Sequence, residues 1–165
     1  MIRRTLDLGC GATPKNPFDL EEVYGIDIRE DLNAGIYKAD LTIEPIPFEA
    51  NYFDSVTAFD FIEHIPRVIY LPERKFPFVE IMNEIFRVLK PGGLFLSFTP
   101  AYPAAAAFRD PTHVNIITEE TFPMYFYDKI RAAKIYGFKG SFSIESQNWH
   151  QGGMHIITIM RKSVI

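Results

Sequence analysis

Short runs of apolar residues recur along the chain, and each of them predicts a strand. The runs are bounded by glycine, proline or acidic residues, which are typical of strand ends. Before residue 100 the expected strands are Arg4–Leu8, Tyr24–Ile28, Ile36–Ala39, Asp54–Phe59 and Leu94–Thr99. Near the C-terminus we expect two more strands, Ser141–Asn148 and Met154–Arg161, joined by a short hairpin-like link at His150-Gln151-Gly152-Gly153.

One longer segment, Pro77–Leu89, has the 3.6-residue period of an amphipathic helix. Its apolar positions on one face are Val79, Met82, Phe86 and Leu89. Proline suits the first turn of a helix, where its missing N–H costs nothing. The following Lys90-Pro91-Gly92-Gly93 predicts the end of the helix and then a turn.

Two shorter helices are also expected. Pro14 and Pro17 leave room for only a short one at Asp19–Val23, because proline is excluded from helix interiors. A second one is expected after Thr118, which has the side chain of an N-cap. It is followed by Glu119 and Glu120, in the first turn where the helix dipole favours acids.

The alternation of strands and helices predicts an α/β fold. We expect a doubly wound, mostly parallel sheet with helices on both faces, to which the C-terminal hairpin adds an antiparallel strand. A chain of 165 residues is the size of one domain, here residues 1–165, and buries roughly 70% of its unfolded surface.

The first strand leads into the most informative segment of the sequence. Thr5–Leu8 is followed by Gly9-Cys10-Gly11, and the next expected strand carries an acid, Asp27, 18 positions after Gly9. Glycines let a loop approach a ligand closely, and an acid about 20 residues further on accepts hydrogen bonds from ribose hydroxyls. This spacing predicts a cofactor that contains adenosine. Pro14 stands where a dinucleotide fingerprint has its third glycine, which disfavours a nicotinamide-dependent oxidoreductase.

Composition narrows the class of partner. The net charge of −4 disfavours nucleic acid and anionic membranes as partners, and we interpret the basic cluster Lys129, Arg131, Lys134 and Lys139 as a solvated face. One cysteine excludes internal disulfides and fits a reducing compartment. Neither a signal peptide nor a membrane span is expected, so the predicted location is the cytoplasm.

Four segments, in this order, carry a family resemblance: D-L-G-C-G at 7–11, G-I-D-I at 25–28, F-D-S-V-T-A-F-D-F-I-E-H-I at 53–65 and E-I-F-R-V-L-K-P-G-G-L-F at 84–95. Together they resemble the class I S-adenosylmethionine-dependent methyltransferases. The resemblance implies S-adenosylmethionine as cofactor, S-adenosylhomocysteine as product, and a seven-stranded Rossmann-like sheet of order 3-2-1-4-5-7-6 with strand 7 antiparallel.

The resemblance also implies which residues bind the cofactor. Asp7 and the loop Gly9, Cys10 and Gly11 would surround its methionine and ribose portions. Asp27 would accept from the ribose hydroxyls, with Ile28 packed on the adenine. The remaining contacts would come from Asp40 and Leu41 at the adenine and from Phe59 and Asp60 beside the methionine portion. Two alternatives stay open: Asp40 begins a turn, and Cys10 is a small packing residue.

The candidate catalytic residues are histidines in loops that follow strands. His113 lies in Arg109-Asp110-Pro111-Thr112-His113, after the fifth strand, where a general base would meet an incoming hydroxyl. His64, in the pair Glu63-His64, is the second candidate. Alternatively, Asp110-Pro111 makes a turn and His113 caps a following helix, while His64 orients its loop.

The D-P-T-H segment resembles family members that act on sugars or other small molecules, so we expect a small-molecule acceptor with a hydroxyl or amine. No metal is expected, because the spacing does not force acids together. Only three residues precede the first strand, so the substrate cover is expected from Val68–Lys75, from Ala101–Ile117 or from a partner subunit, which includes a homo-oligomer. The alternative function is a non-catalytic cofactor-binding module that partners another protein.

Overall fold

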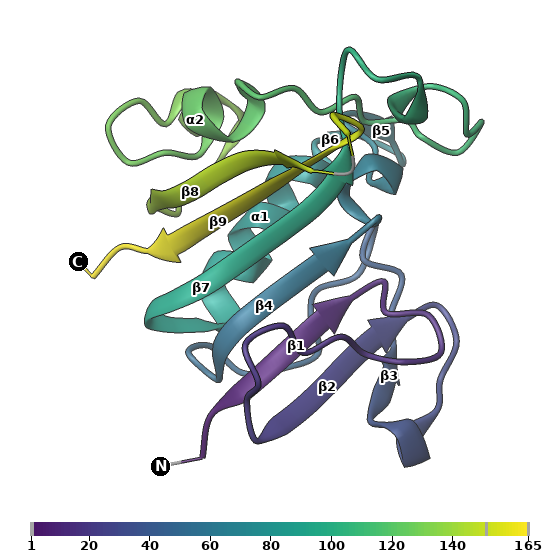
Figure 1. Cartoon of the computed structure of the whole chain (residues 1–165), viewed down its shortest axis with the longest axis vertical. Helices are drawn as coiled ribbons and strands as arrows, with labels where there is room; N and C mark the ends of the chain where they lie inside the picture. The colour runs from purple at the N-terminus through teal and green to yellow at the C-terminus, as the bar shows by residue number, and fades with distance from the viewer. Residues whose placement is uncertain (1, 151, 165) are drawn as a thin grey trace.

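The computed structural model describes residues 2–150 and 152–164 and is built on one seven-stranded sheet (Figure 1). The strand order is β3-β2-β1-β4-β7-β9-β8, and β9 runs antiparallel to both of its neighbours. In the numbering of the seven long strands this is 3-2-1-4-5-7-6, which confirms the predicted topology. The strands are β1 (Arg4–Leu8), β2 (Glu22–Asp27), β3 (Ile36–Lys38), β4 (Phe53–Phe59), β7 (Leu89–Pro100), β8 (Phe142–His150) and β9 (His155–Lys162).

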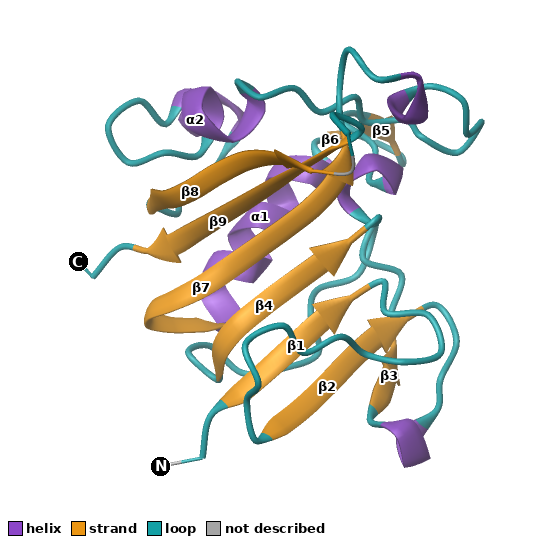
Figure 2. Cartoon of the chain, in the orientation of Figure 1, coloured by secondary structure: helices purple, strands orange, loops and turns teal. Residues whose placement is uncertain are grey.

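The helix α1 (Pro77–Val88) covers one face of this sheet, as Figure 2 shows. Of its predicted apolar face, Val79 and Met82 are buried and Phe86 is half-buried, whereas Leu89 is already the first residue of β7. The side chains of α1 pack with Leu6, Val56, Phe95 and their neighbours in one continuous core. The chain enters β7 directly from the helix, so the turn predicted at Lys90-Pro91-Gly92-Gly93 is wrong: these residues are part of the strand.

Helices on both faces were expected, and this is also wrong. In the described part of the chain α1 is accompanied only by the five-residue α2 (Thr121–Tyr125) and by short 3-10 turns. Figure 2 shows that a loop, rather than a helix, crosses the other face in front of β1 and β2. This loop holds residues 9–21, and its prolines and glycines prevent a helix of useful length.

The predicted helix Asp19–Val23 is absent from the structure for a local reason. Asp19 has a left-handed φ of 50°, and the Asn16 side chain bonds to both the N–H and the carbonyl of Leu20. An asparagine that satisfies the backbone in this way competes with helical hydrogen bonding. The second strand therefore begins at Glu22 and ends at Asp27, earlier than the predicted Tyr24–Ile28.

Thr118 is not the N-cap of a helix. Its hydroxyl accepts from the N–H of Glu120, and the hydroxyl of Thr121 accepts from the N–H of Thr118 at 2.9 Å. These bonds form a turn that delays the helix until Thr121, so Glu119 and Glu120 precede it.

The other predicted strands hold within one or two residues, except that the strand predicted at Leu94–Thr99 begins five residues earlier, at Leu89. The C-terminal strands pair as a hairpin, and in its link Gly153 and Met154 donate to the carbonyl of His150, while Gln151 lies outside the described residues. The segment between residues 66 and 76 forms a small hairpin of β5 (Ile69–Tyr70) and β6 (Arg74–Lys75). None of the helices in the described ranges has the length and apolar character needed to cross a bilayer.

Candidate active site

The glycine loop lies at the carboxyl edge of the sheet, directly after β1. Gly9 and Gly11 have φ values of 63° and 62°, a left-handed conformation that glycine adopts without strain. A Cβ on Gly9 would stand 2.4 Å from the ring of Phe61, so the loop and the segment after β4 touch there. A Cβ on Gly11 would meet no heavy atom within 4 Å. The backbone at Gly11 is therefore open to a ligand.

Asp27 joins this loop to the end of β2. One carboxylate oxygen accepts from the N–H of Gly11 at 3.0 Å, and the other accepts from the N–H and Nε of Arg29 at 3.1 and 3.0 Å. Partial burial raises the pKa of Asp27, but the bonds from Arg29 and Gly11 outweigh it and hold the pKa below its usual range. Asp27 is thus anionic, and because these three donors occupy three of its four acceptor positions, one position on Oδ2 remains for a hydroxyl group.

Asp7 is fully buried below the loop. Its carboxylate accepts from Thr57 Oγ1 at 2.7 Å and from the N–H of Lys15 at 2.8 Å. Burial raises the pKa of Asp7, and the two hydrogen bonds oppose that rise. Asp7 therefore fastens the far end of the glycine loop to the sheet, while Lys15 places its ammonium 4.9 Å from the ring centre of Phe59.

Cys10 packs inward. A Cβ on Gly25 would stand 2.5 Å from its sulfur, and burial raises the pKa of the thiol to about 11. A protonated, buried thiol fits the packing interpretation.

The predicted adenine contacts lie at the ends of β2 and β3. Ile28 is 69% exposed beside Asp27, which leaves an apolar surface available to a ring. Asp40 is exposed, and its side chain accepts from the N–H of Thr42 at 3.0 Å, so it does begin a turn. Leu41 is buried in the core, and its side chain packs away from the surface.

Phe59 and Asp60 end β4 on the other side of the loop. Asp60 has a left-handed φ of 49°, and its carboxylate lies 2.9 Å from Nε2 of His155. His155 in turn stacks on Phe98 at 4.4 Å, and Phe98 contacts the ring of Phe59. This contact between strand ends that are distant in sequence was not predicted.

A second group of polar side chains is centred on Glu63, two residues after Phe61 in the sequence. Glu63 and His64 belong to a 3-10 turn (Ile62–His64) after β4, and His113 comes from the loop after β7. One ligand atom from each of the three residues lies within 4.8 Å of the others, and the two imidazole rings meet edge to face at 4.9 Å. The structure therefore brings together both predicted catalytic histidines.

Glu63 is the buried member of this group, with 1% of its surface exposed. Its Oε2 accepts from Thr99 Oγ1 at 2.7 Å. Burial raises the pKa of Glu63, and the hydrogen bonds only partly offset that effect. Glu63 Oε1 and His113 Nδ1 are both buried without a hydrogen-bond partner among the described residues.

The loop that carries His113 is held against this turn by backbone bonds. Val114 and Asn115 donate their N–H groups to the carbonyl of Glu63, and Asn115 Nδ2 donates to the carbonyl of Ile62. Arg67 donates to Asn115 Oδ1 at 2.7 Å and to the carbonyl of Ile116. Asn115 is fully buried and was not identified from the sequence; its place after D-P-T-H was the only available signal.

The turn expected at Asp110-Pro111 is present, with His113 N–H donating to the carbonyl of Asp110. Since α2 begins only at Thr121, His113 does not cap a helix.

Comparison with known sequences identifies the family. Residues 6–97, more than half of the chain, match the family described as Methyltransferase domain. This chain belongs to that family. A search of the curated proteins finds no significant match.

Solved structures of methyltransferases share the fold. An S-adenosylmethionine-dependent methyltransferase from Archaeoglobus fulgidus has a TM-score of 0.62 at 17% identity, with 98% of this chain and 86% of that one covered. The complex that contains the Haloferax volcanii Trm112 methyltransferase activator gives 0.65 at 11% identity, with coverages of 98% and 83%. The 4+2 cyclase SpnF gives 0.64 at 17%, with coverages of 99% and 75%, so the same fold also carries another reaction.

The protein is an S-adenosylmethionine-dependent methyltransferase, and the described residues fit that cofactor. The open backbone at Gly11, the anionic Asp27 and the exposed Ile28 follow neighbouring strands at the same edge of the sheet. This is the place where doubly wound sheets bind nucleotides.

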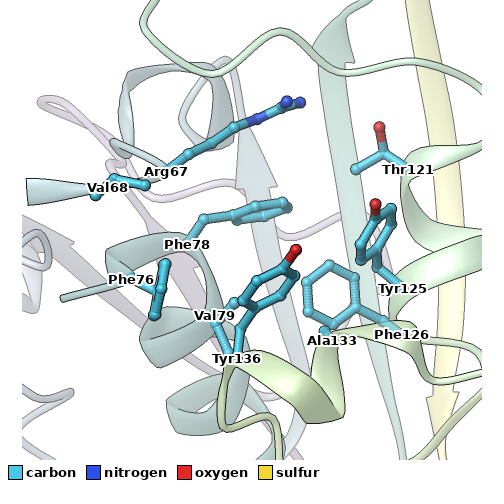
Figure 3. A pocket seen from close by; sticks show the side chains of 10 residues that line it. All are labelled: Arg67, Val68, Phe76, Phe78, Val79, Thr121, Tyr125, Phe126, Ala133 and Tyr136. Atoms are coloured by element: carbon cyan, nitrogen blue, oxygen red, sulfur yellow. The ribbon is translucent and has the colours of Figure 1, made fainter. Parts of the chain in front are cut away.

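Two further cavities lie beyond the strand ends in this methyltransferase. One, of about 660 Å³, is lined by Tyr102, Pro103, Thr118, Glu119, Glu120, Trp149 and Gly153. The other, of about 290 Å³, is shown in Figure 3: aromatic rings from α1, α2 and the turn near residue 136 surround it, and Arg67 extends across one end. Arg67 connects this aromatic cavity to the loop of His113 through its bond to Asn115.

Proposed function

We propose that this methyltransferase acts on a small-molecule hydroxyl or amine, and that a sugar hydroxyl is the first candidate. The observation that carries the proposal is the group Glu63, His64 and His113, which lies next to the glycine loop through Phe61. Methyl transfer to a hydroxyl requires a nucleophile aligned with the methyl group and a way to remove its proton. We propose that this group of residues both aligns the acceptor and removes its proton.

The cofactor supplies a methyl group on a positively charged sulfur, a leaving group that needs no activation. The residues of the chain bind the cofactor and orient it toward the acceptor. We propose that Gly9, Cys10 and Gly11 surround the cofactor, that Asp7 fixes this loop, and that Asp27 binds the ribose with Ile28 against the adenine. Asp40, Phe59 and Asp60 are proposed to complete the site, and Leu41 to support it from the core.

His113 and His64 are the proposed catalytic residues, because their rings meet beside Glu63, two residues after the Phe61 contact with the glycine loop. In a hydroxyl acceptor the oxygen bonds to the methyl carbon as the carbon–sulfur bond breaks, the electron pair of that bond stays on sulfur, and the hydroxyl proton passes to a free imidazole nitrogen of this pair. Glu63, buried and fixed by Thr99, is a positioning residue for this pair.

The larger cavity supports a sugar as acceptor. Tyr102 and Trp149 offer aromatic faces, and Glu119 and Glu120 offer carboxylates that can accept from several hydroxyls. Trp149 is already oriented by its bond to Glu119 at 3.2 Å. A pocket that combines flat apolar faces with fixed acceptors suits a small, hydroxyl-rich ligand.

The cover over the acceptor comes in part from the chain itself. The loop from Ala101 to Ile117 lies against the turn at Glu63, which supports a contribution of this loop to the cover. On the cofactor side, Ile28 and Leu32 are 69% and 61% exposed. We propose that a second subunit, either another copy or a different protein, covers that side.

The experiment that tests this function is transfer of a radiolabelled methyl group from S-adenosylmethionine to pooled sugars and other small metabolites. We expect label in a sugar fraction and none when the reactive hydroxyl is replaced by hydrogen. Nucleic acid and denatured protein serve as control acceptors. Label in either of those instead, or S-adenosylhomocysteine binding without any transfer, would contradict a small-molecule acceptor; the second result would favour the non-catalytic module.

A further inference from the structure

The hydrogen bonds around His64 determine which of its nitrogens is free. The Thr112 hydroxyl has a single hydrogen, and it donates this to Asp110 Oδ1 at 2.6 Å. The same hydroxyl lies 3.1 Å from His64 Nδ1, so it can only accept from an Nδ1–H there. The neutral His64 ring therefore keeps its lone pair on Nε2.

Asp110 orients His113 as well. Its Oδ2 lies 3.9 Å from His113 Nε2, and the bonds from Thr112 hold the pKa of Asp110 below its usual range, so the carboxylate is charged. At 3.9 Å this contact is electrostatic and is not a hydrogen bond; the negative charge favours the proton on Nε2, which leaves the lone pair of His113 on the buried Nδ1. Asp110 thus favours one tautomer of each imidazole: its charge acts directly on His113, and it acts on His64 through the Thr112 hydroxyl.

Each of the three residues brings one ligand atom within 4.8 Å of the other two. Among the described residues, Glu63 Oε1 and His113 Nδ1 are buried without a hydrogen-bond partner. Buried acceptors this close together repel unless a proton or a cation lies between them. Two imidazoles and one carboxylate are a ligand set typical of divalent transition metals, and three protein ligands leave positions for a substrate.

We propose that Glu63, His64 and His113 bind a divalent transition-metal ion, with Asp110 and Thr112 as the outer partners that orient the two histidines. Carboxylate partners behind ligating histidines are a general feature of metal sites. This inference rests on the proposed function and deepens it: with both imidazole lone pairs on the ion, its positive charge beside the acceptor, and not a free imidazole, would favour loss of the hydroxyl proton to solvent. It replaces the expectation, made from spacing alone, that the chain holds no metal.

The test is calorimetric titration of chelator-treated protein with Zn²⁺, without S-adenosylmethionine, and with Co²⁺ absorption as an independent report of ligand geometry. We expect one ion per chain. His64→Ala and His113→Ala should weaken binding by more than the 10–100-fold typical of losing an outer partner, and Asp110→Asn by about 10–100-fold. His150→Ala, which removes a histidine outside the group, is the matched control and should bind as the unmodified protein does.

Glu63→Gln separates a metal site from a structural cluster. Its amide oxygen can keep the bond from Thr99, and its NH₂ can donate to the free Nδ1 of His113. We therefore expect this variant to lose Zn²⁺ binding and yet to melt at a higher temperature than the metal-free parent. Failure of the unmodified protein to bind Zn²⁺, or binding that is unchanged in the histidine variants, overturns the proposal.

These outcomes are independent of the proposed function. Binding of S-adenosylhomocysteine to the chelator-treated protein tests the cofactor site alone, and it should persist in every variant of the group. If the metal binds but no small molecule is methylated, the proposed acceptor is wrong and the metal site stands. If methyl transfer proceeds equally well in chelator and no ion binds, the metal site is wrong and the acceptor stands.

Discussion

Replacing His113 with alanine is expected to lower the turnover of methyl transfer by about 10²–10⁴, the range typical of losing a group that handles the reacting proton. The ring meets His64 and lies next to Glu63, two residues beyond the Phe61 contact with the glycine loop. Cofactor affinity should remain nearly unchanged, because the cofactor residues follow β1, β2 and β4, whereas His113 follows β7. Single-turnover kinetics with the identified acceptor and calorimetry with S-adenosylhomocysteine measure the two quantities.

His150→Ala is the control for this variant, since it removes the same side chain from the end of β8 and should leave turnover unchanged. If His113 only shapes its loop, the loss would appear as reduced stability of about 1 kcal/mol, as for a lost turn or cap bond. An unchanged turnover in His113→Ala would therefore contradict its catalytic role.

The second large effect is expected for Asp27→Ala, which should weaken S-adenosylhomocysteine binding at least tenfold. The carboxylate is anionic, and charge-assisted hydrogen bonds to ribose hydroxyls contribute about 1.5–3 kcal/mol each at most. The substitution also removes the acceptor of the Gly11 N–H, so the open loop loses part of its support. Calorimetric titration measures the affinity, and circular dichroism checks the fold.

Glu30→Ala is the matched control for Asp27, because it removes one negative charge from an exposed position three residues further along. It should bind the cofactor as the parent does. Equal affinity in Asp27→Ala and the parent would show that this carboxylate serves only the network of Arg29 and Gly11.

The sheet was predictable because its strands are short and apolar and are bounded by glycine, proline or acidic residues. β1 has the predicted limits, and the order of the strands followed from the family resemblance. The helices were less predictable. At Asp19 and at Thr118, polar side chains bond to the nearby backbone and replace the expected helical turns, and local sequence does not rank these competing bonds.

The candidate site was predictable where its residues lie close together in the sequence. Gly11, two residues after Gly9, donates directly to Asp27 at the end of the neighbouring strand, as their spacing indicated. The group of Glu63, His64 and His113 was not predictable as a group, because His113 is 49 residues from His64 in sequence and is brought to it by the bonds that hold its loop, including those of Asn115 and Arg67. The positioning roles of Thr112 and Asp110 depend on side-chain geometry that no sequence pattern contains.

The central claim, that the carboxyl edge of this sheet binds S-adenosylmethionine, is tested most directly by thermal unfolding with added S-adenosylhomocysteine. A ligand at about 100 times its Kd that binds only the folded state adds roughly 2.7 kcal/mol. For a domain of this size we expect the Tm to rise by about 5–10 °C, whereas NAD at the same concentration should leave it unchanged. No rise with S-adenosylhomocysteine at millimolar concentration, or an equal rise with NAD, would contradict the account.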